Sequence, residues 1–178
     1  MTGKRKVSGK DIAKAAVERE AFATFLNAMG MGEAVNTIDS QSDDKAPDIT
    51  YSYRGETVAV EIARVADPVL KQYVAQVSQG LQTRGRATFT RDPTPRIIEG
   101  KLNKKYISPY PIELFCYFDR DVITPDDDVC FVISDTVATA SSVLFRKIWY
   151  FGERGIYRLG KAINGEFEES FSKVADLK

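Results

Sequence analysis

Apolar residues near the start of the chain recur with the spacing of an amphipathic helix. They are Ile12, Ala15, Ala16, Phe22, Ala23, Leu26 and Met29. Ser8 has the pattern of an N-cap, with an acidic residue three positions later, and Gly30 ends the run, so we expect a helix of about five turns. The apolar stripe, at about 100° per residue, places Glu18 on its border and Glu20 further into solvent. Of these two carboxylates, only Glu18 is placed to lie along the edge of a core.

Two short alternating runs follow a polar stretch and predict a β-hairpin. Residues 49–53 (ITYSY) and 57–63 (TVAVEIA) are rich in β-branched and aromatic residues, and Arg54-Gly55-Glu56 joins them with a connection of hairpin length. Side chains alternate between the two faces of a strand, so Glu61 shares a face with Ala59 and Ala63. A carboxylate flanked by small side chains has room for a metal ion beside it.

The remaining apolar runs predict an α/β or α+β order of elements. We expect helices over residues 68–81 and 95–106. We expect strands over residues 112–118, 129–133, 147–151 and 155–159. The tail, residues 166–178, has the pattern of an amphipathic helix or of a frayed end.

Composition is that of one globular domain over residues 1–178, with residues 1–8 as a basic arm. The chain has 178 residues, of which 43% are hydrophobic and 28% are charged. No apolar run approaches the roughly 20 residues that cross a bilayer, and no apolar signal core follows the basic N-terminus. We therefore expect a cytoplasmic protein with no membrane partner.

Charge and residue types narrow the chemistry further. The 25 basic and 25 acidic residues balance, so any nucleic-acid affinity must come from local basic patches. Two such patches are Lys4, Arg5, Lys6 and Lys10 near the N-terminus, and Arg96, Lys101, Lys104 and Lys105 on a predicted helix. The chain has no histidine, which excludes histidine bases and the usual zinc sites. Cys116 and Cys130 lie in apolar, strand-like runs, where a buried thiol packs in the core.

Phosphodiester hydrolysis without histidine generally uses a divalent metal ion, which needs two or three converging oxygen ligands. Asp48 and Glu61 are nearly equidistant from the Arg54-Gly55 turn, so a hairpin makes them neighbours across the two strands. The alternative is that Glu61 is an exposed strand residue paired with Arg54 or Arg64.

These residues resemble the core of the restriction-endonuclease-like, PD-(D/E)xK nucleases, and in particular the archaeal Holliday junction resolvase branch. The resemblance covers Glu18-Arg-Glu20, Pro47-Asp48, the hairpin and Glu61-x-Ala63, with looser similarity in the later helices, which is roughly the first 45% of the chain. It implies an α/β fold with a mixed central sheet flanked by helices, and a Mg²⁺ or Mn²⁺ site. In the family pattern the ligands fall on Asp48, Glu61 and the Ile62 carbonyl, with Glu18 in support. The implied partner is nucleic acid, DNA in the first place, and a homodimer is compatible with the fold.

The family's lysine, two residues after the glutamate, is replaced by Ala63. That lysine orients the attacking water and counters charge in the transition state. Candidates for a cation supplied from elsewhere are Lys71, Lys101 and Lys105, among which we favour Lys101. The alternative for each is a solvated lysine on a helix surface.

Other notable side chains have simpler interpretations. Asp126-Asp127-Asp128 follows Pro125 and precedes a predicted strand, so we expect a solvated turn. Trp149, Tyr150 and Tyr157 lie in strand-like runs and are expected in the core. Two functions stay open: a metal-dependent DNA nuclease, or a catalytically inactive member of the same fold that binds nucleic acid or protein. Ala63 motivates the second.

Overall fold

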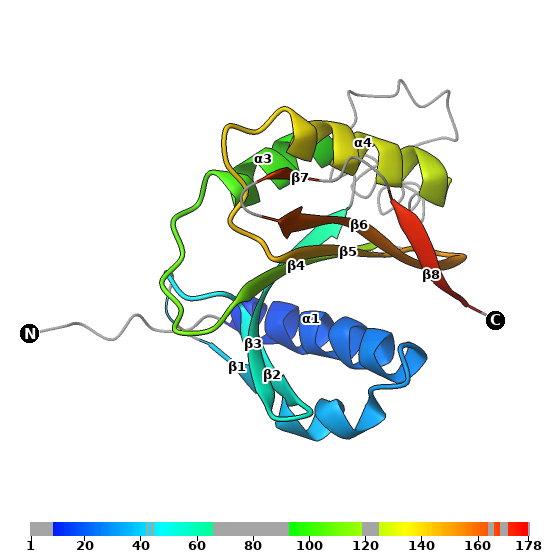
Figure 1. Cartoon of the computed structure of the whole chain (residues 1–178). Coiled ribbons are helices and arrows are strands. Elements are labelled where there is room, and N and C mark those ends of the chain that lie inside the picture. The colour runs from blue at the N-terminus through cyan, green and yellow to red at the C-terminus, as the bar shows by residue number, and fades with distance from the viewer. Residues whose placement is uncertain are drawn as a thin grey trace, which may run out of the picture.

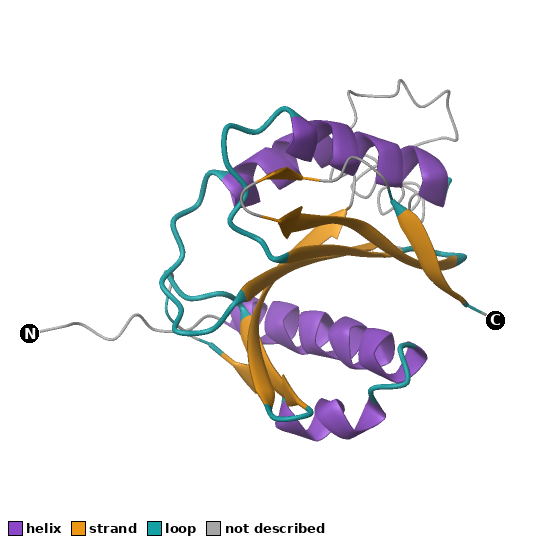
Figure 2. Cartoon of the chain, viewed as in Figure 1, coloured by secondary structure: helices purple, strands orange, loops and turns teal. Residues whose placement is uncertain are grey.

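A computed structural model of the chain describes residues 9–41, 43, 45–65, 93–118, 125–163, 166–167 and 171–177. A mixed β-sheet forms its centre, with helices on both faces (Figures 1 and 2). Helix α1 (Gly9–Ala28) covers one face, and α3 (Thr94–Leu102) and α4 (Asp126–Ala138) cover the other. The expected α/β class is confirmed.

The sheet has the strand order β1-β2-β3-β4-β5-β6-β7, and β8 also pairs with β6. The strands are β1 (Asp39–Ser40), β2 (Ile49–Tyr53), β3 (Glu56–Val65), β4 (Ile112–Phe118), β5 (Lys147–Phe151), β6 (Gly155–Ile163), β7 (Glu166–Phe167) and β8 (Ser172–Asp176). A short 3-10 helix, η1 (Gly32–Thr37), links α1 to β1. β3, β4 and β5 are parallel neighbours, with α3 preceding β4 and α4 preceding β5, whereas β2 is antiparallel to β3.

The β2–β3 hairpin is confirmed and closes through a tight turn. Arg54 and Gly55 have φ values of 50° and 82°. Positive φ at both central positions matches the twist of a two-residue hairpin, and glycine adopts it without steric cost. The turn thereby sets the register in which Ile49 pairs with Val60.

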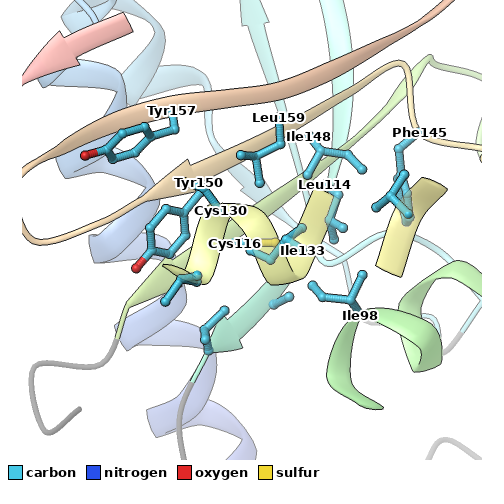
Figure 3. Close-up of a cluster of buried hydrophobic side chains, with 14 of the residues drawn as sticks. Ile98, Leu114, Cys116, Cys130, Ile133, Phe145, Ile148, Tyr150, Tyr157 and Leu159 are labelled. Atoms are coloured by element: carbon cyan, nitrogen blue, oxygen red, sulfur yellow. The ribbon is translucent and has the colours of Figure 1, made fainter. Parts of the chain in front are cut away.

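Two cores lie on opposite faces of the sheet. Phe22, Phe25 and Leu26 of α1 pack on Val60 and Ile62 in one of them. The other joins α3 and α4 to the sheet; its side chains include Ile98, Leu114, Cys116, Cys130, Ile133, Phe145, Ile148, Tyr150, Tyr157 and Leu159 (Figure 3). Ala59 and Ala63 belong to this second core, so the strand alternation that places Glu61 beside two alanines is confirmed.

Helix α1 is confirmed, but the predicted apolar stripe is wrong in its first half. Ile12 is 62% exposed, and Ala15 and Ala16 are exposed as well. Only the later turns reach the sheet, where Phe22, Phe25 and Leu26 are buried. The spacing of apolar residues alone does not show how many turns of a helix pack on the sheet.

Two predicted elements are wrong. Residues 129–133, expected as a strand, belong to α4, because the buried Val129, Cys130, Ile133 and Val137 recur with helical spacing over a longer window. The tail, expected as a helix or a frayed end, contains β7 and β8, and β8 completes pairing along β6. The helix expected over 95–106 ends earlier, at Leu102. The helix expected over 68–81 and the basic arm at 1–8 lie outside the described residues.

Candidate functional site

The hairpin register places Asp48, just before the start of β2, beside Glu61 of β3. Ile49 pairs with Val60, so residue 48 is the next position along the ladder, opposite residue 61. Asp48 Oδ2 accepts a hydrogen bond from the Ile62 N–H at 2.7 Å. The Asp48 carboxylate therefore lies against the β3 backbone, and the Ile62 peptide borders both acidic residues.

Glu61 is fully buried, with 0% of its surface exposed. Its Oε1 atom accepts hydrogen bonds from Lys101 Nζ at 2.5 Å and from Lys104 Nζ at 3.2 Å. Its Oε2 atom has no hydrogen-bond partner among the described residues. The interpretation of Glu61 as an exposed strand residue is wrong, because this carboxylate is enclosed.

Lys101 links the two carboxylates. Its ammonium group lies 2.5 Å from Glu61 Oε1 and 3.7 Å from Asp48 Oδ2. Ile98, three residues earlier on α3, is fully buried, so Lys101 follows it on the helix face that packs on the sheet. The lysine side chain remains 23% exposed, which leaves part of the group accessible from solvent.

Ala63 lies two residues after Glu61, which Lys101 binds, on the same face of β3. Ala63 is buried and pairs with Cys116 in the β3–β4 ladder. Burial raises the pKa of the Cys116 thiol to about 12, and the positive charge of Lys101 acts on it in the opposite direction. Lys101 of α3 thus supplies a positive charge near the position on β3 where Ala63 stands in place of the lysine of the sequence pattern.

Glu18 lies at the edge of this group, as its position on the stripe predicts. It is buried, whereas Glu20 is exposed, and it forms an ion pair of 3.4 Å with Lys14. Burial raises the pKa of Glu18 above its ordinary value, and the charge of Asp48 raises it further, while Lys14 and Lys101 lower it. The charges of Asp48 and Lys101 therefore both act on the Glu18 carboxylate.

Lys104 and Tyr106 also contact the site; the sequence placed Lys104 in a basic patch but indicated neither residue as part of the site. The Lys104 ammonium lies 4.7 Å from the centre of the Tyr106 ring, in cation–π contact. The Tyr106 hydroxyl donates to the Lys101 carbonyl at 3.2 Å, and burial followed by the charge of Glu61 raises its pKa. The spacing of Lys101 and Lys104, three residues apart, was a usable signal for a second ammonium at the same carboxylate.

The structure describes one of the two other candidate lysines. Lys105 is exposed, and Lys71 lies outside the described residues. Within the described part of the chain, no three acidic or cysteine side chains converge closely enough to form a metal centre by themselves. Asp48 and Glu61 supply hard oxygen ligands, and Glu61 Oε2 is a buried acceptor with no hydrogen-bond partner among the described residues. This donor set fits Mg²⁺ or Mn²⁺ once a backbone carbonyl or water completes it.

The acidic run at 126–128 is not a solvated turn. It forms the first turn of α4, and Asp126 is buried. The Asp126 carboxylate accepts hydrogen bonds from the Glu153 and Arg154 N–H groups at 2.9 and 2.8 Å, and from the Tyr150 and Tyr157 hydroxyls at 3.4 and 3.3 Å. Asp126 thus anchors the β5–β6 turn to α4.

The expected core positions of Cys116, Cys130, Tyr150 and Tyr157 are confirmed, since all four are buried and both cysteines are free thiols. Cys130 lies in a helix rather than the strand-like setting that its sequence suggests. Trp149 is only half-buried.

Comparisons of the chain with known protein families, curated proteins and solved structures find no match. In the described part of the chain, no helix combines the length and the apolar character needed to span a bilayer.

Proposed function

We propose that the protein is a metal-dependent DNA nuclease of the PD-(D/E)xK type, in which Lys101 of α3 replaces the lysine missing at Ala63. The observation that carries the proposal is the contact of one ammonium group with both Asp48 and Glu61. A restriction-endonuclease-like fold is part of the proposal. The order of α1, the β2–β3 hairpin and the parallel strand β4 supports it.

The arrangement of charges suits phosphodiester hydrolysis. Asp48, Glu61 and the Ile62 carbonyl, with Glu18 in support, would hold a divalent ion, which lowers the pKa of a bound water and neutralises phosphate charge. Lys101 has three N–H donors, of which one suffices to hold Glu61. The others are free to bond a phosphate oxygen as negative charge develops in the transition state. In this proposal Asp48 and Glu61 bind the ion, while Lys101 stabilises the transition state.

The partly exposed Lys104 gives the site a second positive charge. Its side chain is 34% exposed and rests on the Tyr106 ring. That position allows it to move from Glu61 to a neighbouring phosphate while it keeps its aromatic contact. We propose that Lys104 contributes mainly to DNA affinity, in an interaction that weakens as salt rises.

A second candidate function is a catalytically inactive domain of the same fold that binds nucleic acid or protein. One observation favours it: Lys101 and Lys104 already neutralise Glu61 without a metal ion. The two functions differ in their response to Mn²⁺. The nuclease binds the ion and gains thermal stability, whereas the inactive domain shows neither a thermal shift nor cleavage.

The direct test is cleavage of supercoiled plasmid and branched DNA in Mg²⁺ and in Mn²⁺. We expect cleavage by the wild type, none by Asp48→Ala or Glu61→Ala, and a rate for Lys101→Met that is lower by roughly a hundredfold or more. Lys173→Met is the matched control, because Lys173 lies on β8 and forms an ion pair with Asp176 of the same strand. Circular dichroism checks that each variant is folded. Cleavage that persists in both alanine variants contradicts the proposal.

A further inference from the structure

A pocket lies on the sheet face opposite to Glu61. Its apolar wall includes Phe25 of α1, Met29 and Met31 just beyond that helix, and Trp149 of β5. Phe25 belongs to the core that packs on the α1 face, whereas Glu61 shares its face with the alanines of the other core. Met29, Met31 and Trp149 are each only partly buried. The wall is thus an accessible apolar surface with an aromatic ring on it.

A buried carboxylate fixes the polar side of this pocket. Glu113 is 2% exposed and accepts hydrogen bonds from Arg146 Nη2 at 2.8 Å and from the Trp149 Nε1–H at 2.7 Å. Lys147 Nζ lies 3.5 Å from the same carboxylate and 5.6 Å from the centre of the Trp149 ring. These bonds hold the indole in one orientation and place two cations beside it. The single negative charge of Glu113 balances only one of these two positive charges.

The second anion is Glu56, which differs from Glu113 in its setting. It adjoins the Arg54-Gly55 turn at the start of β3, with 56% of its side chain exposed, and accepts a hydrogen bond from Arg146 Nη1. That bond, and then the charge of Arg146, lower the pKa of Glu56 below its ordinary value. An exposed carboxylate on a turn can swing into water at little cost, because exposed ion pairs contribute little to stability. Without Glu56, the pocket carries one uncompensated positive charge beside an apolar wall.

We propose that this pocket binds a small molecule in which a planar aromatic ring carries an anionic group. The ring packs on Trp149 and the methionines, which are polarisable and adapt to flat ligands. The anion replaces the Glu56 carboxylate on Arg146, whose planar guanidinium suits carboxylate and phosphate groups equally. The proposal is independent of the nuclease hypothesis, because it uses neither Asp48 nor Glu61.

Fluorescence of Trp149, the single tryptophan of the chain, reports on this site directly. The probes are 5′-AMP and benzoate, each titrated to about 1 mM, beside their uncharged counterparts adenosine and benzamide. We expect a saturable change with at least one anion, and weaker binding of its uncharged counterpart. Binding of AMP alone assigns a nucleotide, binding of benzoate alone assigns an aromatic carboxylate, and binding of both assigns the general ring-plus-anion class.

Two variants, Glu56→Gln and Arg146→Met, and one control variant, Glu153→Gln, test the exchange of anions at Arg146. Glu56→Gln removes the competing carboxylate, so the anionic probe should bind about three- to tenfold more tightly. Glu153→Gln, at another exposed glutamate in the β5–β6 turn, should leave affinity unchanged. Arg146→Met should weaken binding by at least about tenfold, but it also deprives buried Glu113 of a partner, so Glu56→Gln is the decisive variant if Arg146→Met does not fold. No binding of either anion, equal binding of charged and uncharged probes, or no effect of Glu56→Gln overturns the proposal.

Discussion

Replacement of Lys101 by methionine should destabilise the protein more than the loss of a solvated surface lysine would. Methionine keeps the length and apolar character of the side chain but removes the ammonium group that contacts Glu61 and Asp48. Breaking a buried ion pair from one side costs about 3–5 kcal/mol, because the remaining charge stays enclosed. Glu61 is fully buried but keeps Lys104 at 3.2 Å. We therefore expect a smaller loss in unfolding free energy, about 2 kcal/mol.

The related variants should rank in a defined order. Lys104→Met removes the longer and more exposed contact, so we expect a loss of about 1 kcal/mol or less. Glu61→Gln removes the buried charge itself, and both lysines can turn toward water, so it should cost less than Lys101→Met. In the double variant Lys101→Met/Glu61→Gln, the penalty of an unpaired buried charge disappears. The loss of unfolding free energy in the double variant should therefore be smaller than the sum of the losses in the two single variants, with a coupling energy of about 1–2 kcal/mol.

Thermal and urea unfolding, followed by Trp149 fluorescence, measure these differences. For a chain of this size, 2 kcal/mol corresponds to a fall in Tm of roughly 4–8 °C. Lys173→Met is the control for loss of a lysine at an exposed ion pair. If Lys101→Met is no less stable than this control, or if its effect adds to that of Glu61→Gln, then Lys101 does not neutralise Glu61.

Three further predictions concern other parts of the molecule. Burial raises the pKa of Glu18, so ionisation of this carboxyl above pH 4.5 opposes folding. Glu18→Gln should therefore have a higher Tm than the wild type at pH 7, and this difference in Tm should disappear as the pH falls to about 4. Asp126→Ala should lower the unfolding free energy by about 2–4 kcal/mol in urea unfolding, because four donors lose their acceptor, whereas exposed Asp127→Ala should cost about 1 kcal/mol or less. Mn²⁺ at a hundred times its Kd should stabilise the wild type by about 2.7 kcal/mol and leave the Tm of Asp48→Asn unchanged.

Elements defined by local patterns could be predicted from the sequence. The hairpin follows from strict alternation around Arg54-Gly55, and the runs at 112–118 and 147–151 coincide with β4 and β5. Residues 129–133 misled the prediction because β-branched residues dominate that short run. The helical spacing emerges only when Val137, which is also buried, is included.

The candidate site could be predicted only in part. Asp48 and Glu61 are brought together by a single tight turn, which is a local feature. Lys101 reaches Glu61 from 40 residues away through packing of α3 on β3. The sequence indicates three lysines for that place; tertiary packing brings Lys101 to Glu61 and leaves Lys105 exposed, whereas Lys71 lies outside the described residues. The network of Glu113 and Arg146, separated by 33 residues, has no local pattern at all.

The measurement that tests the central claim most directly is the cleavage rate of Lys101→Met with and without a second change, Ala63→Lys. If Lys101 supplies the charge that Ala63 does not, Lys101→Met should lose roughly a hundredfold or more in rate. The double variant, which returns a lysine to β3 and is checked for folding by Trp149 fluorescence, should recover part of that loss. Cleavage by Lys101→Met at the wild-type rate would contradict the account.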